Sequence, residues 1–113
     1  MAAAAICSVR GGSKEQMGHA CAMALKNLMG LVCDPVAGLV EVPCVKRNVG
    51  GAVNALAAAD MALAGIASHI PVDQVIDAMG EVGMKMDVSL RETSMGGVAT
   101  SPKGLEIAER IGM

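Results

Sequence analysis

Apolar residues recur at helical spacing through the first third of the chain. Residues 2–10 form an alanine-rich run that we expect to be the end of a helix, stopped by Gly11-Gly12. No capping residue precedes this run, so the helix is expected to begin upstream. Ser13 and Gln16 have the spacing of a capping box, which predicts a second helix over 14–29. Its apolar face is expected to carry Met17, Cys21, Ala24, Leu25 and Leu28.

Two further helices are predicted in the middle of the chain. Residues 47–68 are apolar around nearly the whole helical circumference, which is typical of a helix at the centre of a fold. Pro71 suits a first helical turn, and the apolar spacing after it predicts an amphipathic helix over 72–83.

The last third is less regular. Residues 84–100 are ambiguous, with one helical turn expected at 90–94 and a break at 95–97. Ser101-Pro102 predicts the start of a short terminal helix. No alternating pattern persists anywhere, so the predicted fold class is all-α. Helices are expected to pack around a central apolar helix, 47–68, with a long irregular cysteine loop before it.

Composition indicates that these helices belong to a larger assembly. The 113 residues contain no Phe, Tyr or Trp, although aromatic side chains usually supply the largest blocks of buried area in a small core. Alanine, 14 glycines and 10 methionines take their place, and these bury little area or specify packing weakly. We therefore interpret residues 1–113 as one segment of a bigger protein or complex, in preference to a free-standing bundle.

Charge and hydropathy exclude two classes of partner. The formal net charge is −2 and no basic stripe exists, so nucleic acid is not an expected partner. Residues 49–70 approach the length of a bilayer span, but Asn54 and Asp60 favour a buried helix in a soluble protein over a membrane segment. We see no secretion signal, and four cysteines without one favour free or metal-bound thiols in a reducing cytoplasm.

The candidate chemistry lies between Gly30 and Asn48. Cys33 and Cys44 fall in a segment punctuated by Pro35, Gly38 and Pro43, which is too irregular for a helix interior. Two soft thiolates on such a loop suit an iron–sulfur cluster, although a free cysteine is also commonly a small buried hydrophobe. A structural zinc site is a poor match, because no partner His or Cys pair accompanies the two cysteines.

As a whole string, Gly30-Leu-Val-Cys-Asp-Pro-Val-Ala-Gly-Leu-Val-Glu-Val-Pro-Cys-Val-Lys-Arg-Asn48 closely resembles the iron–sulfur-dependent L-serine dehydratases, in the C-terminal part of their α chain. The later run Ser89-Leu-Arg-Glu-Thr93, followed by Gly96-Gly97, resembles the same family, so the likeness covers essentially the whole chain. The resemblance implies a [4Fe-4S] cluster with Cys33 and Cys44 as ligands. The family's third cysteine lies in an upstream Gly-Cys-Gln segment, which this sequence does not contain.

The resemblance also implies an activity. An L-serine ammonia-lyase of this kind eliminates water from L-serine and releases pyruvate and ammonia without pyridoxal phosphate, using the open iron of the cluster as a Lewis acid. Arg47 and Asn48 match the end of the motif and are candidate substrate-binding residues, a guanidinium for the carboxylate and an amide for the amine. The alternative interpretation is that Arg47 and Asn48 lie in the first turn of a helix and face solvent or a partner. The catalytic base stays unassigned, because His19 and His69 are interpreted as structural.

Other candidates receive structural interpretations. Asp34 is expected to cap the turn at Pro35 rather than to act in catalysis. Cys7 and Cys21 match no ligand position of the family, and we expect both to be packing residues.

The expected partners follow from the resemblance. They are L-serine, the remainder of the α chain and a separate β chain, since the chain ends Gly112-Met113 where some single-chain relatives end in cysteine. A homo-oligomer stays open. The alternative functions are a non-catalytic helical scaffold and a related L-cysteine desulfidase.

Overall fold

The computed structural model describes residues 1–112, which divide into two compact units. The first unit combines Met1–Met29 with Gly50–Met84, and the second combines Gly30–Val49 with the chain from Lys85 onward. Each unit is therefore built from two segments that are distant in the sequence.

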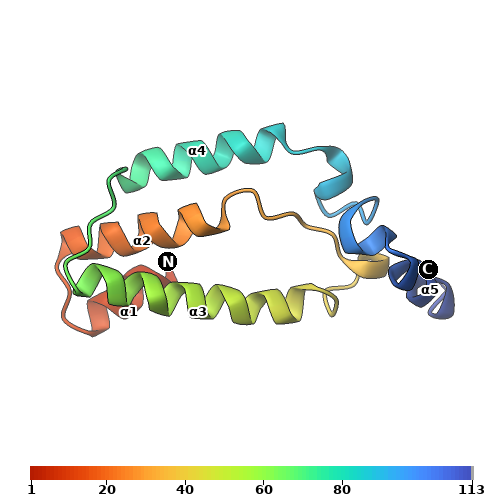
Figure 1. Ribbon diagram of the computed structural model, residues 1–113, viewed down its shortest axis with the longest axis horizontal. Helices are drawn as coiled ribbons and strands as arrows, with labels where there is room; N and C mark the ends of the chain where they lie inside the picture. Colours follow the sequence, from red (N-terminus) through yellow and green to blue (C-terminus); the bar gives the residue numbers. More distant parts are fainter. Residues whose placement is uncertain (113) are drawn as a thin grey trace. The chain divides into compact units, whose positions relative to one another are not determined.

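The prediction of an all-α fold is confirmed, and residues 1–112 contain no strand (Figure 1). The α-helices are α1 (Ala2–Val9), α2 (Lys14–Leu28), α3 (Cys44–Leu63), α4 (Val72–Lys85) and α5 (Pro102–Arg110). Three short 3₁₀ turns accompany them: η1 (Val36–Gly38), η2 (Val88–Leu90) and η3 (Gly97–Thr100).

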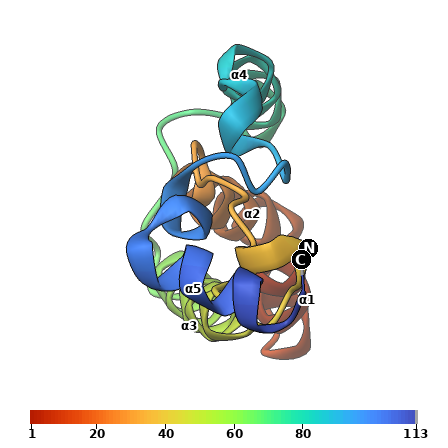
Figure 2. The same cartoon turned by 90° about the vertical axis from the view of Figure 1, so that its right-hand side faces the viewer.

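Small side chains form the core of the first unit. Within this unit α2 lies between α3 and α4, with α4 parallel and α3 antiparallel to it (Figures 1 and 2). Alanine at the contacts allows the helix backbones to approach closely, which explains how a core forms without aromatic residues. The buried cluster consists of Ala3, Cys7, Ala20, Met23, Ala55, Ala58, Ala59 and Ala62.

The start of α2 is confirmed in detail. The Gln16 amide donates to Ser13 Oγ at 3.1 Å, and the Ser13 amide donates to Gln16 Oε1 at 2.9 Å, so both halves of the capping box are made. The predicted apolar face of α2 is wrong in part. Its most buried residues are Ala20, Ala22 and Met23, because Ala20 and Met23 pack in the core cluster with residues of α1 and α3.

The predicted bounds of the long helix are also wrong. It begins at Cys44 rather than 47, because the Pro43 carbonyl accepts the first helical bond, from the Arg47 amide, at 3.1 Å. It ends at Leu63 rather than 68, because Gly65 adopts a φ of 89°. The Gly65 and Ile66 amides then donate back into the last turn, which is the Schellman arrangement for ending a helix.

The expected turn at 90–94 is wrong, and the observed turn is η2 at Val88–Leu90. Glu92 and Ser94 have φ values of 66° and 58°, which are incompatible with a right-handed turn there. Gly97 was expected to break the structure, yet it opens η3. α4 continues to Lys85, slightly beyond its predicted end, and Ser101 caps α5 as predicted, by accepting from the Gly104 amide at 3.2 Å.

Several apolar side chains of α3 are exposed, including Val49, Val53 and Leu56 at 63%, 59% and 43%. Its place at the centre of the fold stays a prediction. Of the helices in residues 1–112, none combines the length and the hydropathy that a bilayer span requires.

The first unit is closely packed around Gly12. A Cβ built there would lie 2.4 Å from Cys7 Sγ and 2.8 Å from the Cys7 carbonyl oxygen. We expect Gly12→Ala to lower the free energy of unfolding by about 1–3 kcal/mol through overpacking. Gly18→Ala is the matched control, since nothing lies within 4 Å of its Cβ, and it is expected to be neutral or stabilising. Thermal unfolding of the two variants tests this; equal midpoints would contradict the close approach.

Candidate functional site

Cys33 is fixed by backbone hydrogen bonds on both sides within the second unit. Its amide donates to the Leu90 carbonyl at 2.9 Å, and its carbonyl accepts from the Glu92 amide at 2.8 Å. Cys33 and Arg91 form an isolated parallel bridge. The cysteine loop is therefore held against the Leu-Arg-Glu-Thr segment, the other part of the sequence that carries the family resemblance.

Asp34 connects the cysteine loop to α3 and to η3. It is 1% exposed, and it accepts from Arg47 Nη1 at 2.5 Å and from the Val98 amide at 2.6 Å. Burial alone would raise the pKa of the Asp34 carboxyl, but the Val98 and Arg47 hydrogen bonds outweigh it and hold the pKa below its usual range. Asp34 was predicted to cap its own turn; the amide that it caps instead belongs to η3, far along the chain.

Gly97 packs directly on the Asp34 carboxylate. A Cβ at Gly97 would lie 2.1 Å from Asp34 Oδ2, and the φ of Gly97 is 62°. Gly38 shares the left-handed backbone, with a φ of 73°, but nothing lies within 4 Å of its Cβ.

We expect Gly97→Ala to destabilise the protein by about 1–3 kcal/mol more than Gly38→Ala, because only the first adds a clash to the backbone strain. Thermal unfolding of the two variants measures the difference. If Gly38→Ala were as damaging as Gly97→Ala, the contact between Gly97 and Asp34 would not be the cause.

The two candidate ligand cysteines lie in the same unit. Both thiols are free and partly buried, with Cys44 at the first position of α3. The pKa of the Cys33 thiol is raised, first by partial burial and then by the nearby charges of Glu92, Cys44 and Asp34, while Arg47 opposes the shift. A bound cation would reverse this effect, because a coordinated thiol is deprotonated.

Arg47 and Asn48 follow Cys44 in the first turns of α3. Arg47 Nη1 donates to Asp34 Oδ1 and, at 3.1 Å, to the Val32 carbonyl. The Arg47 side chain is still 40% exposed, so these bonds do not remove it from solvent. Asn48 is exposed on the same helix.

The donor chemistry of Cys33 and Cys44 fits an iron–sulfur cluster in part. Thiolates are the usual ligands of such clusters, and these two are partly accessible. However, no group of three or more His, Cys, Asp or Glu residues in the described chain, 1–112, is arranged to hold a metal ion. Cys33 and Cys44 are thus two thiols of suitable chemistry, one fewer than the three cluster ligands that the family resemblance leads us to expect.

The remaining cysteines and His19 have structural surroundings. Cys7 is fully buried in the core of the first unit, as predicted, and Cys21 is partly buried. His19 Nδ1 accepts from the Ser68 amide at 3.1 Å, which fixes the loop after α3. His69 is exposed.

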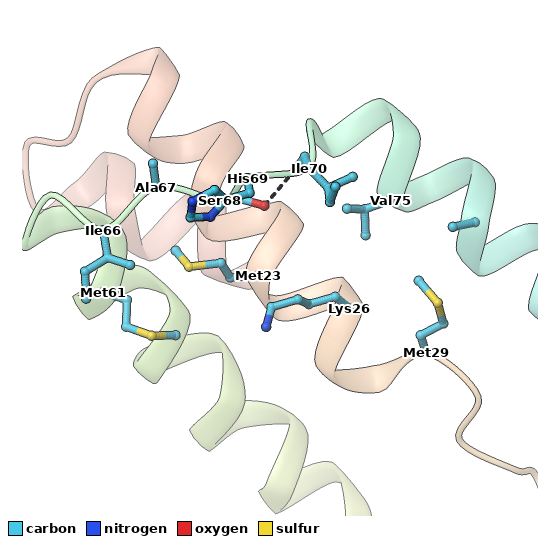
Figure 3. A pocket seen from close by; sticks show the side chains of 11 residues that line it. Met23, Lys26, Met29, Met61, Ile66, Ala67, Ser68, His69, Ile70 and Val75 are labelled. Atoms are coloured by element: carbon cyan, nitrogen blue, oxygen red, sulfur yellow. Dashed lines mark hydrogen bonds between the residues drawn. The ribbon is translucent and has the colours of Figure 1, made fainter.

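The described part of the chain has a hollow in each unit. In the first unit a largely apolar pocket of about 490 Å³ is surrounded by Met23, Met29 and Met61, and Ser68 at its edge donates to the Ile70 carbonyl at 2.7 Å (Figure 3). In the second unit a pocket of about 410 Å³ is lined by residues that include Glu92 and Ser94. Neither pocket is lined by a predicted ligand or substrate residue, and no pattern in the sequence predicted either pocket.

Comparison with known proteins places these features in a family. The sequence pattern of the serine dehydratase alpha chain family matches residues 1–99. The chain belongs to this family. It is 62% identical over 111 residues to the "Probable L-serine dehydratase, alpha chain" of Bacillus subtilis (strain 168), covering 98% of this chain and 37% of that protein.

Two further relatives agree. The chain is 58% identical to the "Probable L-serine dehydratase, alpha chain" of Latilactobacillus sakei, over 98% of this chain and 53% of that protein. It is 52% identical to the "L-serine dehydratase, alpha chain" of Peptoniphilus asaccharolyticus, over 95% of this chain and 37% of that protein. The chain thus spans between about a third and a half of the length of these serine dehydratase alpha chains.

Proposed function

We propose that this chain is part of an iron–sulfur L-serine ammonia-lyase and supplies two ligands of its [4Fe-4S] cluster, Cys33 and Cys44. The observation that carries the proposal is the joining of the cysteine loop and the Leu-Arg-Glu-Thr segment in one unit, with both thiols and Arg47 in it. The names of the three relatives support the substrate and the reaction.

The overall reaction converts L-serine into pyruvate and ammonia. The α-proton and the β-hydroxyl leave as water, and the resulting aminoacrylate takes up water as it hydrolyses to the two products. When bound by three protein ligands, the cluster supplies an iron with an open position, which can polarise the hydroxyl that leaves.

The chain's own residues hold the substrate in this proposal. Arg47 binds the serine carboxylate through the guanidinium nitrogens that Asp34 and Val32 do not engage. Asn48 orients the amine from the same helical turn. The N-terminal end of α3, at Cys44, further favours negative charge because the first amides of a helix point toward it.

Partners and compartment are part of the proposal. The third ligand comes from the remainder of the α chain, since the relatives are longer than this chain. A separate β chain completes the enzyme, as the words "alpha chain" in the relatives' names imply for those proteins. The four free cysteines suit a reducing cytoplasm.

The test is substrate turnover by the complete protein, produced with its β chain and reconstituted with iron and sulfide under anaerobic conditions. L-serine, L-threonine and L-cysteine are offered side by side, and the keto acid and ammonia released are measured. We expect L-serine to have the highest kcat/KM, and we expect hydroxylamine, which traps pyridoxal phosphate, not to inhibit the reaction.

Faster turnover of L-cysteine with release of sulfide would replace the proposal with the related desulfidase activity. No turnover of any of the three by protein that carries a full cluster would favour the non-catalytic scaffold.

A further inference from the structure

Asp34 is the one charged residue in the described part of the chain that is buried. A buried carboxylate is costly unless it is paired and hydrogen-bonded, so its position needs a reason. It lies directly after the proposed ligand Cys33 and contacts the proposed substrate residue Arg47.

We propose that Asp34 is a positioning residue that sets the direction of the Arg47 guanidinium for the substrate carboxylate. The inference rests on the proposed function and deepens it, because it names what orients the substrate-binding group.

The two oxygens of Asp34 have different partners, which prevents the carboxylate from turning. Oδ1 accepts from Arg47 Nη1 at 2.5 Å, and Oδ2 accepts from the Val98 amide at 2.6 Å. Because Val98 lies in η3, the carboxylate is anchored to a backbone turn rather than to a mobile side chain. The anchor for Arg47 is therefore rigid.

The Arg47 guanidinium is in turn held through one of its nitrogens, Nη1. Nη1 bonds both Asp34 and the Val32 carbonyl, which fixes the guanidinium plane from two directions. The Arg47 side chain is 40% exposed, so it keeps contact with solvent while it holds Asp34. An arginine fixed in this way loses less side-chain entropy when it binds a carboxylate, and its hydrogen bonds already point along fixed directions.

The space around Asp34 leaves no room for a longer side chain. Gly97 leaves no room beside Oδ2, so a longer glutamate would collide with the η3 backbone. Cys33, the preceding residue, is fixed to Leu90 and Glu92 by its own backbone bonds. The same few residues thus fix a proposed cluster ligand and the proposed substrate arginine relative to each other.

The experiment compares Asp34→Asn with Ser94→Ala in the complete, reconstituted protein. Asparagine keeps the size of the side chain but loses the charge and one acceptor. Ser94 Oγ donates to the Pro35 carbonyl at 2.6 Å, so Ser94→Ala removes a connection between the same two segments without touching Arg47. For each variant KM, kcat and the iron and sulfide content per chain are measured.

We expect Asp34→Asn to raise KM for L-serine about 10–100-fold, with kcat within about 3-fold and the iron and sulfide content unchanged. Ser94→Ala is expected to leave KM unchanged. In an Arg47→Lys background, Asp34→Asn should raise KM by less than about 3-fold, because its effect passes through Arg47.

Three results would overturn the inference while the proposed function stands: an unchanged KM in Asp34→Asn, an equal rise in KM with and without Arg47, or loss of iron and sulfide in Asp34→Asn. The last result would mean that Asp34 maintains the structure of the cysteine loop rather than the direction of Arg47. Absence of serine turnover in the unsubstituted, cluster-loaded protein would overturn both the proposed function and the inference. This outcome differs from the three above, in which the unsubstituted protein still turns over L-serine.

Discussion

Cys33→Ser is expected to lower kcat/KM for L-serine by at least about 10³-fold in the complete protein. A serine hydroxyl is a poor ligand for iron in a site built for soft thiolates, and the Lewis acid contributes several kcal/mol to the reaction. Cys44→Ser is expected to have the same effect, because both thiols belong to the same ligand set in our proposal. Pyruvate release after anaerobic reconstitution measures both losses.

Cys21→Ala is the matched control for these two variants. Cys21 is partly buried like the candidate ligands but lies on α2 in the first unit, away from the cysteine loop in sequence. We expect its turnover to stay within about 2-fold of the unsubstituted protein. If Cys33→Ser kept more than about a tenth of the activity, Cys33 would not be a ligand.

Arg47→Lys is expected to lower kcat/KM for L-serine about 10–100-fold, mainly by raising KM. Lysine keeps the positive charge beside Asp34, but it cannot hold Asp34 and Val32 and at the same time bind a carboxylate with two parallel bonds. The loss corresponds to one charge-assisted interaction, about 1.5–3 kcal/mol. Steady-state kinetics over a wide range of serine concentration measures it.

Lys46→Ala supplies the control for charge. Lys46 precedes Arg47 on the same exposed turn of α3, and no catalytic or binding role is proposed for it. We expect its KM to be close to that of the unsubstituted protein. A rise in KM equal to that of Arg47→Lys would show that general positive charge, rather than the guanidinium of Arg47, attracts the substrate.

Local signals in the sequence were sufficient for most helix starts. Ser13 with Gln16, Pro71, and Ser101 with Pro102 each act within one helical turn, and the helices begin there as predicted. The end of α3 was missed although Gly65 was a readable signal, because the apolar pattern continues past it to Ser68. Periodicity alone does not show where a helix stops when the next residues are also apolar.

The arrangement around Asp34 could not be predicted from local pattern. Asp34 and its donors, Arg47 and Val98, come from three separate parts of the sequence. The sequence motif identified Cys33, Cys44 and Arg47 as candidates, but it contained no signal that a neighbouring carboxylate would be buried between them and η3. Such a group is found only when the fold brings these three parts together.

The most direct test of the central claim is the iron and acid-labile sulfide content per chain of the complete protein after anaerobic reconstitution, compared with Cys33→Ser. We predict roughly four iron and four sulfide per chain in the unsubstituted protein, and loss of both in the variant. An equal iron and sulfide content in the two proteins would contradict the proposal that Cys33 holds the cluster.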